Sequence, residues 1–345
     1  MAALEPPRAF TPLPVAGRLR AVPEDFVVDE RLGFEPDGDG QHLLLKIRKR
    51  GSNTEWVARM LARHARVPVR DVGFAGLKDR HSVAQQWFSV PSSAAPVESW
   101  LDVREPEFEV VAVHRHGRKL RRGALAGNRF CIRLRELDGE LDTIDGRLAL
   151  IRSQGVPNYF GVQRFGTDGS NLRALAGWAV DGLEIKSRNE RSFTLSAGRS
   201  LLFNAVLAER VRRGQWARLL PGDVANLDGS GSIFDVAAST PELEQRCTGL
   251  DIHPTGPLWG NGELRVAGEV ADLENAVVDR FEPVASALGR AGLDQERRSL
   301  RLRVDELEAR QLEDGLEITF GLGPGEFATA VMRELGDFFT AGISA

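Results

Sequence analysis

One carboxylate flanked by two cations stands out among the residues that are able to do chemistry. Asp79 lies between Lys78 and Arg80, directly after the glycine-containing segment VGFAGL. Two cationic neighbours favour the ionised form of a carboxyl group and so lower its pKa. An ionised carboxylate that is held in place can act as a nucleophile or as a base. Asp79 is therefore the candidate catalytic group, although in most proteins the same tripeptide is a plain surface turn.

Other reactive side chains do not complete a catalytic set. His81 directly follows the Lys-Asp-Arg tripeptide, whereas a Ser-His-Asp triad needs three groups that converge from separate parts of the chain. His114 and His116 fall on one face of a predicted strand, but no third metal ligand accompanies them. The glycine-rich turn at 321–325 lacks the Lys-Ser/Thr pair of a P-loop. We therefore expect no metal site and no nucleotide cofactor.

Asn128 and Phe130 form a second candidate group. An amide can hydrogen-bond to both the donor and the acceptor edges of a nucleic-acid base, and a phenyl ring can stack on the face of one. Phe130 also shares its face of an alternating segment with Ile132 and Leu134. Taken alone, this alternation favours a core position for Phe130.

Charge is unevenly distributed along the chain. The 345 residues include 45 basic and 49 acidic ones, and the net charge of −4 argues weakly against a nucleic-acid partner. Residues 115–135 nevertheless contain eight basic residues and no acidic one. A phosphate backbone responds to such a local patch more than to the distant total. A solvated, charged hairpin has the same pattern, so the charges alone favour neither interpretation.

The composition is that of a globular chain. Its 42% hydrophobic and 27% charged residues exclude disordered, collagen-like and coiled-coil proteins. The two cysteines, Cys131 and Cys247, are far apart and exclude a disulfide framework. No apolar run reaches the ~18 residues of a membrane span, and the N-terminus lacks the layout of a signal peptide. We expect a cytoplasmic protein with two domains.

Hydrophobic periodicity predicts the elements that must position these side chains. The predicted strands cover residues 26–30, 42–48, 86–90, 108–114, 130–135, 300–304 and 316–320. The predicted helices cover about 54–66, 141–153, 201–213, 271–291 and 326–338. Strand-rich segments dominate both ends of the chain, and a loop-rich, glycine-rich segment lies between them. This order predicts an α+β core with an inserted domain.

Five blocks of the sequence together resemble the TruD family of tRNA pseudouridine synthases. They follow one another in one order across most of the chain, which makes the match far more specific than any single short motif. The blocks are PEDFVVDERLGFEPDGDGQHLLLKIRKRG (23–51), AGLKDRHSVAQQWFSV (75–90), LRRGALAGNRF (120–130), VPNYFGVQRFG (156–166) and RNERSFTLSAGRSLLFN (188–204).

The resemblance implies a fold and an activity. The fold is an α+β one, with a mixed, mainly antiparallel sheet and flanking helices in the permuted order of this family. A catalytic domain at 1–156 and 305–345 and an inserted α/β TRUD domain at 157–304 are expected. The implied activity isomerises a uridine of tRNA, at position 13 in the D arm, to pseudouridine, with no cofactor and no metal. The implied partner is tRNA, with no membrane and no obligate protein partner, so a monomer is expected.

The resemblance also assigns roles to individual residues. The GxKD block places the catalytic aspartate on Asp79. The PEDF, GNRF and GEFAT blocks place substrate-binding roles on Phe26, Asn128, Phe130 and Phe327. Six residues before Phe26 the family often has a lysine that steadies the site. This chain has Arg20 there, which we expect in the substrate-binding site and which keeps the charge but not the shape of the contact.

Basic side chains near these blocks are the expected phosphate contacts. They come from the stretch 115–135 and from the cluster 46–50, and arginines of the central segment extend them. The expected contacts are Arg118, Lys119, Arg121, Arg122, Lys49 and Arg50, with Arg188, Arg191, Arg297, Arg298 and Arg301 as the extension. Binding through them should weaken steeply with salt.

Two other functions are alternatives to the synthase. A structured-RNA binding protein without chemistry explains the basic stretch and the aromatic residues, but it gives Asp79 no task. A hydrolase that uses Asp79 as its nucleophile on a small phosphorylated substrate calls for a metal or a phosphate loop, and the sequence has neither.

Overall fold

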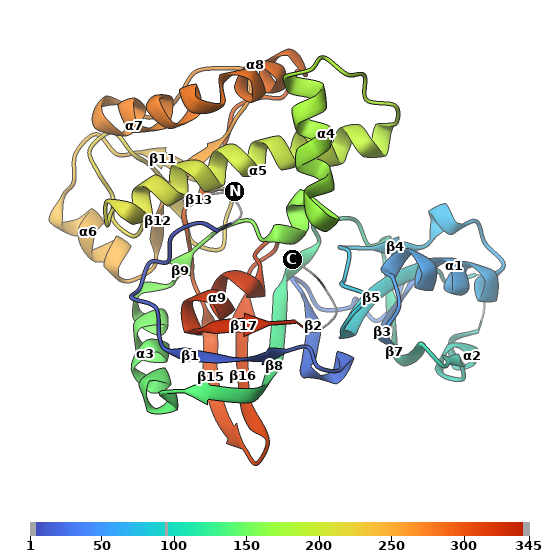
Figure 1. The fold of residues 1–345 in the computed structure, drawn as a ribbon. Coiled ribbons are helices and arrows are strands. Elements are labelled where there is room, and N and C mark those ends of the chain that lie inside the picture. The colour runs from blue at the N-terminus through green and yellow to red at the C-terminus, as the bar shows by residue number, and fades with distance from the viewer. Residues whose placement is uncertain (1–4, 94–95, 341–345) are drawn as a thin grey trace.

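The computed structural model describes residues 5–93 and 96–340 (Figure 1). Its largest element is an eleven-stranded sheet in which eight strands follow one path. In spatial order these are β15 (Asp305–Leu312), β16 (Gly315–Leu322), β8 (Leu125–Gly139), β2 (Phe26–Leu32), β5 (Val83–Pro91), β3 (His42–Arg50), β7 (Phe108–His116) and β6 (Arg104–Glu105). The β2–β5 pair is parallel and the other pairs along this path are antiparallel. The expected mixed, mainly antiparallel sheet is thus confirmed.

Three short strands extend this sheet off the main path. β1 (Val15–Leu19) pairs antiparallel with β8 and parallel with β17 (Asp337–Phe339), so the two ends of the described chain lie side by side. β4 (Gly73–Phe74) pairs with β5 and leads into the loop that carries Asp79. The sheet therefore collects segments from both ends of the sequence around β8.

The β8 strand forms the centre of the fold because its side chains alternate between core and surface. Phe130, Ile132 and Leu134 are buried, as their alternation predicts. They pack with strands β2 and β16 and with two helices, α3 (Ile144–Gln154) and α9 (Ala328–Leu335). The second half of the sheet has its own core, which β3, β5 and β7 share with α1 (Thr54–Ala65) and α2 (Val97–Leu101).

The middle of the chain forms a separate group of elements. The long helix α5 (Arg188–Arg212) runs beside α4 (Ser170–Ala179), α7 (Gly268–Val278) and α8 (Glu282–Arg290) at the top of the view in Figure 1. A four-stranded sheet has the order β11 (Ile233–Asp235), β10 (Val224–Leu227), β12 (Ile252–Leu258), β13 (Glu296–Ser299). Helix α5 also contacts β12 of this sheet, and α6 (Pro241–Thr248) contacts the same strand. The chain enters and leaves this group through the antiparallel pair β9 (Val156–Pro157) and β14 (Arg301–Leu302).

Several predicted boundaries were wrong. The helix expected over 271–291 is two helices, because Pro283 stands in the first turn of α8 and removes a backbone donor there. The strand expected over 300–304 shrinks to β14, and the polar, largely exposed β15 was not predicted at all. The last helix ends at Leu335 rather than at 338, and β17 follows it. Of the described helices, none combines the length and the apolar character needed to cross a bilayer.

Candidate active site

All six residues to which the sequence assigned catalysis or substrate binding line one hollow of about 420 Å³. They come from five separate places in the fold. Arg20 follows β1, Phe26 begins β2, Asp79 lies in the loop between β4 and β5, Asn128 and Phe130 belong to β8, and Phe327 immediately precedes α9. The large sheet thus brings together residues that are up to 307 positions apart (327 − 20).

The Asp79 carboxylate is held from several sides. Its Oδ2 accepts hydrogen bonds from Nη1 of Arg20 at 2.7 Å and from Nε2 of Gln163 at 3.1 Å. Its Oδ1 accepts the backbone N–H of His81 at 3.0 Å. Its side chain is 24% exposed, so the carboxylate is fixed but still reachable from the hollow.

These contacts determine the charge of Asp79. Burial by itself would raise the pKa of the carboxyl group, because it disfavours the charged form. The positive charge of Arg20 and the hydrogen bonds from His81, Gln163 and Arg20 oppose burial, and the pKa of Asp79 ends below its ordinary value. The carboxylate is therefore ionised at neutral pH. The sequence neighbours Lys78 and Arg80 are not among the main causes of the lowered pKa.

Arg20 occupies a specialised position next to this carboxylate. Its backbone is in the left-handed region, with φ of +59°, and its side chain lines the hollow. The guanidinium carbon lies 3.9 Å from the centre of the Phe26 ring. A flat guanidinium can stack on a ring and bond a carboxylate at once, whereas an ammonium is a compact point charge. Arg20 thus joins the aromatic wall to the candidate catalytic group.

Aromatic rings form the walls of the hollow. Phe26 and Phe130 meet edge to face with ring centres 6.0 Å apart, and Phe320 stacks behind Phe130 at 5.4 Å. Phe327 directly precedes α9 and contacts Phe160 edge to face, with ring centres 6.0 Å apart. Phe26 and Phe130 are buried, so their positions are set by the core, while Phe327 is only partly buried. The hollow therefore has one rigid aromatic wall and a second wall that is more open.

A buried polar network holds Asn128 at the edge of the hollow. Nζ of Lys78 donates to Oδ1 of Asn128 at 2.5 Å and pairs with the Glu30 carboxylate at 2.8 Å. Burial raises the pKa of Glu30, and the Lys78 charge opposes this effect. Because Oδ1 accepts from Lys78, the amide nitrogen of Asn128 is the group that it can offer as a donor to a ligand.

Two further groups line the hollow that the sequence did not single out. Glu326 accepts the backbone N–H of Gly323 at 2.7 Å, and its burial raises the pKa of its carboxyl group to about 7. The guanidinium carbon of Arg164 lies 5.8 Å from the Phe327 ring centre, and Nη1 of Arg164 donates to Ser196 at 2.8 Å. Both residues line the hollow together with Asp79.

The prediction that Lys49 contacts RNA phosphates was wrong. Its side chain is 0% exposed, and its Nζ donates to the backbone carbonyl of Ser52 at 2.6 Å and to that of Asp79 at 3.0 Å. Burial lowers the pKa of Lys49 to about 8. Every second residue of a strand faces inward, so the basic run 48–50 alternates between solvent and core. Lys49 consequently helps to hold the loop that carries Asp79.

The other expected phosphate contacts differ in exposure. Arg118, Arg121 and Arg122 are exposed and Lys119 is half-buried. Arg50 is exposed but forms an ion pair with Glu24 at 2.5 Å. In the central segment Arg188 and Arg191 are exposed.

Two arginines of the central segment, Arg297 and Arg301, were wrongly expected on the RNA-facing surface, whereas Arg298 is half-buried and stays a candidate. Arg297 is buried in an ion pair with Glu274 at 2.7 Å. Arg301 is buried and donates to the backbone carbonyls of Cys247 and Ile252. Arg298 lies over the Phe160 ring at 4.4 Å, and burial lowers its pKa to about 10.

Comparison with known proteins identifies the group to which this site belongs. The sequence model of the family described as tRNA pseudouridine synthase D (TruD) matches residues 10–182 and 179–335. The chain belongs to the TruD family. It is 46% identical over 333 residues to the tRNA pseudouridine synthase D of Methylococcus capsulatus, covering 96% of this chain and 94% of the relative. It is 45% identical over 354 residues to that of Xanthomonas euvesicatoria pv. vesicatoria, covering 97% and 95%.

A solved structure has the same fold. The crystal structure of a Methanosarcina mazei protein that carries the TruD name superimposes with a TM-score of 0.71 over 95% of each chain. Its sequence is 20% identical, so this likeness supports the fold and not the details of the site. The expected fold class and the family resemblance are both confirmed.

Within this TruD protein, the contact of Gln163 with Asp79 was missed from the sequence. The residue stands in the block VPNYFGVQRFG, which carried the family resemblance, but nothing in that block indicates which side chain faces the aspartate. Arg164 lies in the same block. The short helical turn Val162–Phe165 places both of them at the hollow.

Proposed function

We propose that this protein isomerises uridine to pseudouridine in tRNA, at position 13 of the D arm, with Asp79 as the catalytic residue. The observation that carries the proposal is the ionised Asp79 carboxylate in a hollow walled by Phe26, Phe130 and Phe327. Membership of the TruD family supports the reaction and the substrate class.

The reaction requires the target nucleotide to leave its helix. The bond between uracil N1 and ribose C1′ breaks, the base turns, C5 bonds to C1′, and the C5 proton is lost while N1 gains one. Extruding a nucleotide costs a few kcal/mol, and stacking at roughly 1–3 kcal/mol per base offsets that cost. The rings of Phe26, Phe130 and Phe327 supply this stacking surface, and the Asn128 amide donates to the base or the ribose.

Asp79 supplies the negative charge beside the reacting bond. Its ionised state, held by Arg20 and Gln163, suits a nucleophile or a base toward the ribosyl-uracil unit. Once detached, the base must stay in place until it has turned. A hollow with buried aromatic walls limits its escape and limits access of water.

Recognition of the folded RNA rests on the surroundings of the hollow. We assign phosphate contacts to Arg118, Lys119, Arg121 and Arg122. Through these contacts the protein would recognise the shape of the D arm. Residues 157–304 act as an inserted domain that contributes Gln163 and Arg164 to the site. The protein acts as a cytoplasmic monomer in this proposal.

One assay separates this proposal from RNA binding without chemistry. Unmodified tRNA is incubated with the protein, treated with carbodiimide, and reverse-transcribed to locate pseudouridine. A single stop at the uridine of position 13 is expected. Asp79→Asn should lower the rate at least about a thousandfold while tRNA affinity stays within a few-fold. Asp102→Asn, at an exposed position, is the control. Wild-type protein that binds tRNA and forms no pseudouridine would favour the binding-protein interpretation instead.

A further inference from the structure

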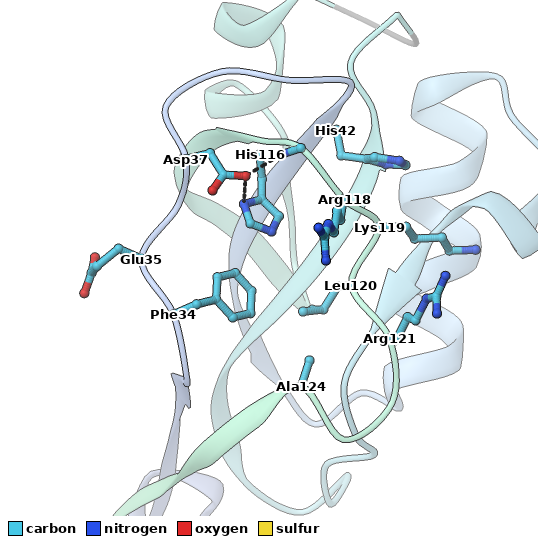
Figure 2. Close-up of a pocket in the computed structure, with 11 residues that line it drawn as sticks. Phe34, Glu35, Asp37, His42, His116, Arg118, Lys119, Leu120, Arg121 and Ala124 are labelled. Carbon is cyan, nitrogen blue, oxygen red and sulfur yellow. Dashed lines mark hydrogen bonds and ion pairs between the residues drawn. The ribbon is translucent and has the colours of Figure 1, made fainter.

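A second hollow is lined in part by basic side chains and is larger than the one that contains Asp79. We call it the basic hollow. It measures about 950 Å³ and is formed by the chain before β3 and the chain after β7. Figure 2 shows Phe34 and His116 on one side of it and Arg118, Lys119 and Arg121 on the other. Between them, Leu120 and Ala124 provide an apolar floor.

The wall that carries Phe34 and His116 is preorganised. The two rings are stacked with centres 4.8 Å apart and an angle of 17° between their planes. The Asp37 carboxylate lies 2.8 Å from Nδ1 of His116, within ion-pair distance, and accepts the backbone N–H of Gly117 at 2.8 Å. A Cβ at Gly40 would lie 2.6 Å from the backbone of Gly117, so the two loops pack backbone against backbone. The hollow thus exists before a ligand binds.

The arginines of the opposite wall are not paired with acidic side chains in the part of the chain that the structure describes. Across residues 5–93 and 96–340, no carboxylate lies within ion-pair distance of Arg118, Arg121 or Arg122. The acidic Glu35 of the facing loop also lines the hollow, on the far side of Phe34 from the arginines (Figure 2). Unpaired guanidinium groups can bind the phosphate of a phosphodiester. An apolar floor beside them can contact the adjoining sugar and base.

The two hollows share one wall. The loop between β7 and β8 contributes Arg121 and Ala124 to the basic hollow and Gly123 to the hollow that contains Asp79, which Leu125, the first residue of β8, also lines. A nucleic-acid strand with one nucleotide in the Asp79 hollow can therefore reach the basic hollow by passing this loop.

We propose that this basic hollow is a second RNA-binding site, which takes a phosphodiester and its adjoining nucleoside from a part of the tRNA other than the reacting uridine. This inference rests on the proposed function for the identity of the RNA. It assigns Arg118 and Arg121 to the phosphate, and Phe34, Leu120 and Ala124 to the nucleoside.

Two variants test the charge and the apolar part separately. Arg118→Gln/Arg121→Gln should raise the tRNA Kd ten- to a hundredfold, with the loss of activity falling mainly on KM. The slope of log K against log salt should become shallower by about 0.7–0.9 for each phosphate that the variant no longer neutralises. Phe34→Leu should raise the Kd about three- to tenfold and keep the wild-type salt slope. Arg59→Gln/Arg63→Gln, two exposed arginines one turn apart on α1, is the matched control and should bind as wild type does.

A cross-link locates the bound RNA. Benzoylphenylalanine in place of Phe34 should cross-link to one nucleotide of full-length tRNA that is not the modified uridine. Wild-type affinity and salt slope in the double arginine variant would overturn the inference, as would an unaffected Phe34→Leu or a cross-link to the modified uridine itself. If the wild-type protein forms no pseudouridine and the arginine variant still loses RNA affinity, the proposed function fails and the second site stands.

Discussion

The side-chain amide of Gln163 donates a hydrogen bond to the Asp79 carboxylate, with 3.1 Å between Nε2 and Oδ2. The two residues are 84 positions apart and come from different groups of elements. Asp79 belongs to the loop that enters β5 of the large sheet, whereas Gln163 belongs to the turn that follows β9. The central segment of the chain therefore contributes a direct contact to the candidate catalytic group.

Gln163 should act as a positioning residue for Asp79. Gln163→Ala is expected to lower kcat about tenfold or more, since a hydrogen bond to a charged group contributes about 1.5–3 kcal/mol, while KM for tRNA changes little. Gln163→Glu places a second carboxylate beside Asp79, which raises the pKa of Asp79 and moves the acid limb of the pH profile to higher pH. Single-turnover rates across a pH series measure both effects. Gln154→Ala, at an exposed position, is the control, and wild-type rates in Gln163→Ala would contradict the role.

Arg20 should determine the pH at which the enzyme loses activity in acid. Its charge opposes the effect of burial on Asp79, so Arg20→Gln lets the pKa of Asp79 rise. In the proposed mechanism the active form is the ionised carboxylate, and its population falls as the pH drops through that pKa. The acid limb of kcat/KM should therefore shift to higher pH in Arg20→Gln and less so in Arg20→Lys, which keeps the charge. Arg18→Gln, which loses only an ion pair with Glu136, should keep the wild-type profile.

Lys49 should affect chemistry rather than RNA affinity. Lys49→Met keeps the length of the side chain and removes the donor to the Asp79 carbonyl. We expect kcat to fall about tenfold or more, because a charged donor to a buried carbonyl is worth about 1.5–3 kcal/mol. The tRNA Kd should stay within about twofold, and its salt slope should match that of the wild type. A shallower salt slope in filter-binding measurements would restore Lys49 as a phosphate contact.

Glu326 should make the folding stability depend on pH. Burial raises its pKa to about 7 from an ordinary value of 4.5, so between these values the folded state binds the proton more tightly than the unfolded state does. Its contribution to stability is complete below pH 4.5 and is lost as the pH rises through 7. The Glu326→Gln variant has no carboxyl group to titrate here and so does not lose this contribution. Its free energy of unfolding relative to that of the wild type should therefore rise by up to about 3 kcal/mol between pH 5 and pH 8.

Urea unfolding at the two pH values measures this difference. Glu313→Gln, at an exposed position, should show the same pH dependence as the wild type. Parallel behaviour of Glu326→Gln and wild type would show that Glu326 stays ionised in the folded protein.

Local sequence determined much of this protein by itself. The alternation in 130–135 predicted a strand with Phe130 and Ile132 inside, because neighbouring side chains of a strand point to opposite faces. Motif blocks were enough to gather Asp79, Asn128 and the phenylalanines as one set of candidates, and the family they indicated is the one to which the chain belongs.

Tertiary structure decided which groups touch those candidates. Arg20 and Gln163 lower the pKa of Asp79, whereas the adjacent Lys78 points to Glu30 and Asn128. Lys49 is a second example. The sequence places it in a basic cluster, but its position in strand β3 directs its side chain into the core. Electrostatic contacts depend on distance in space, and a strand exposes only alternate residues. A run of charges in the sequence therefore does not specify which of its members faces the RNA.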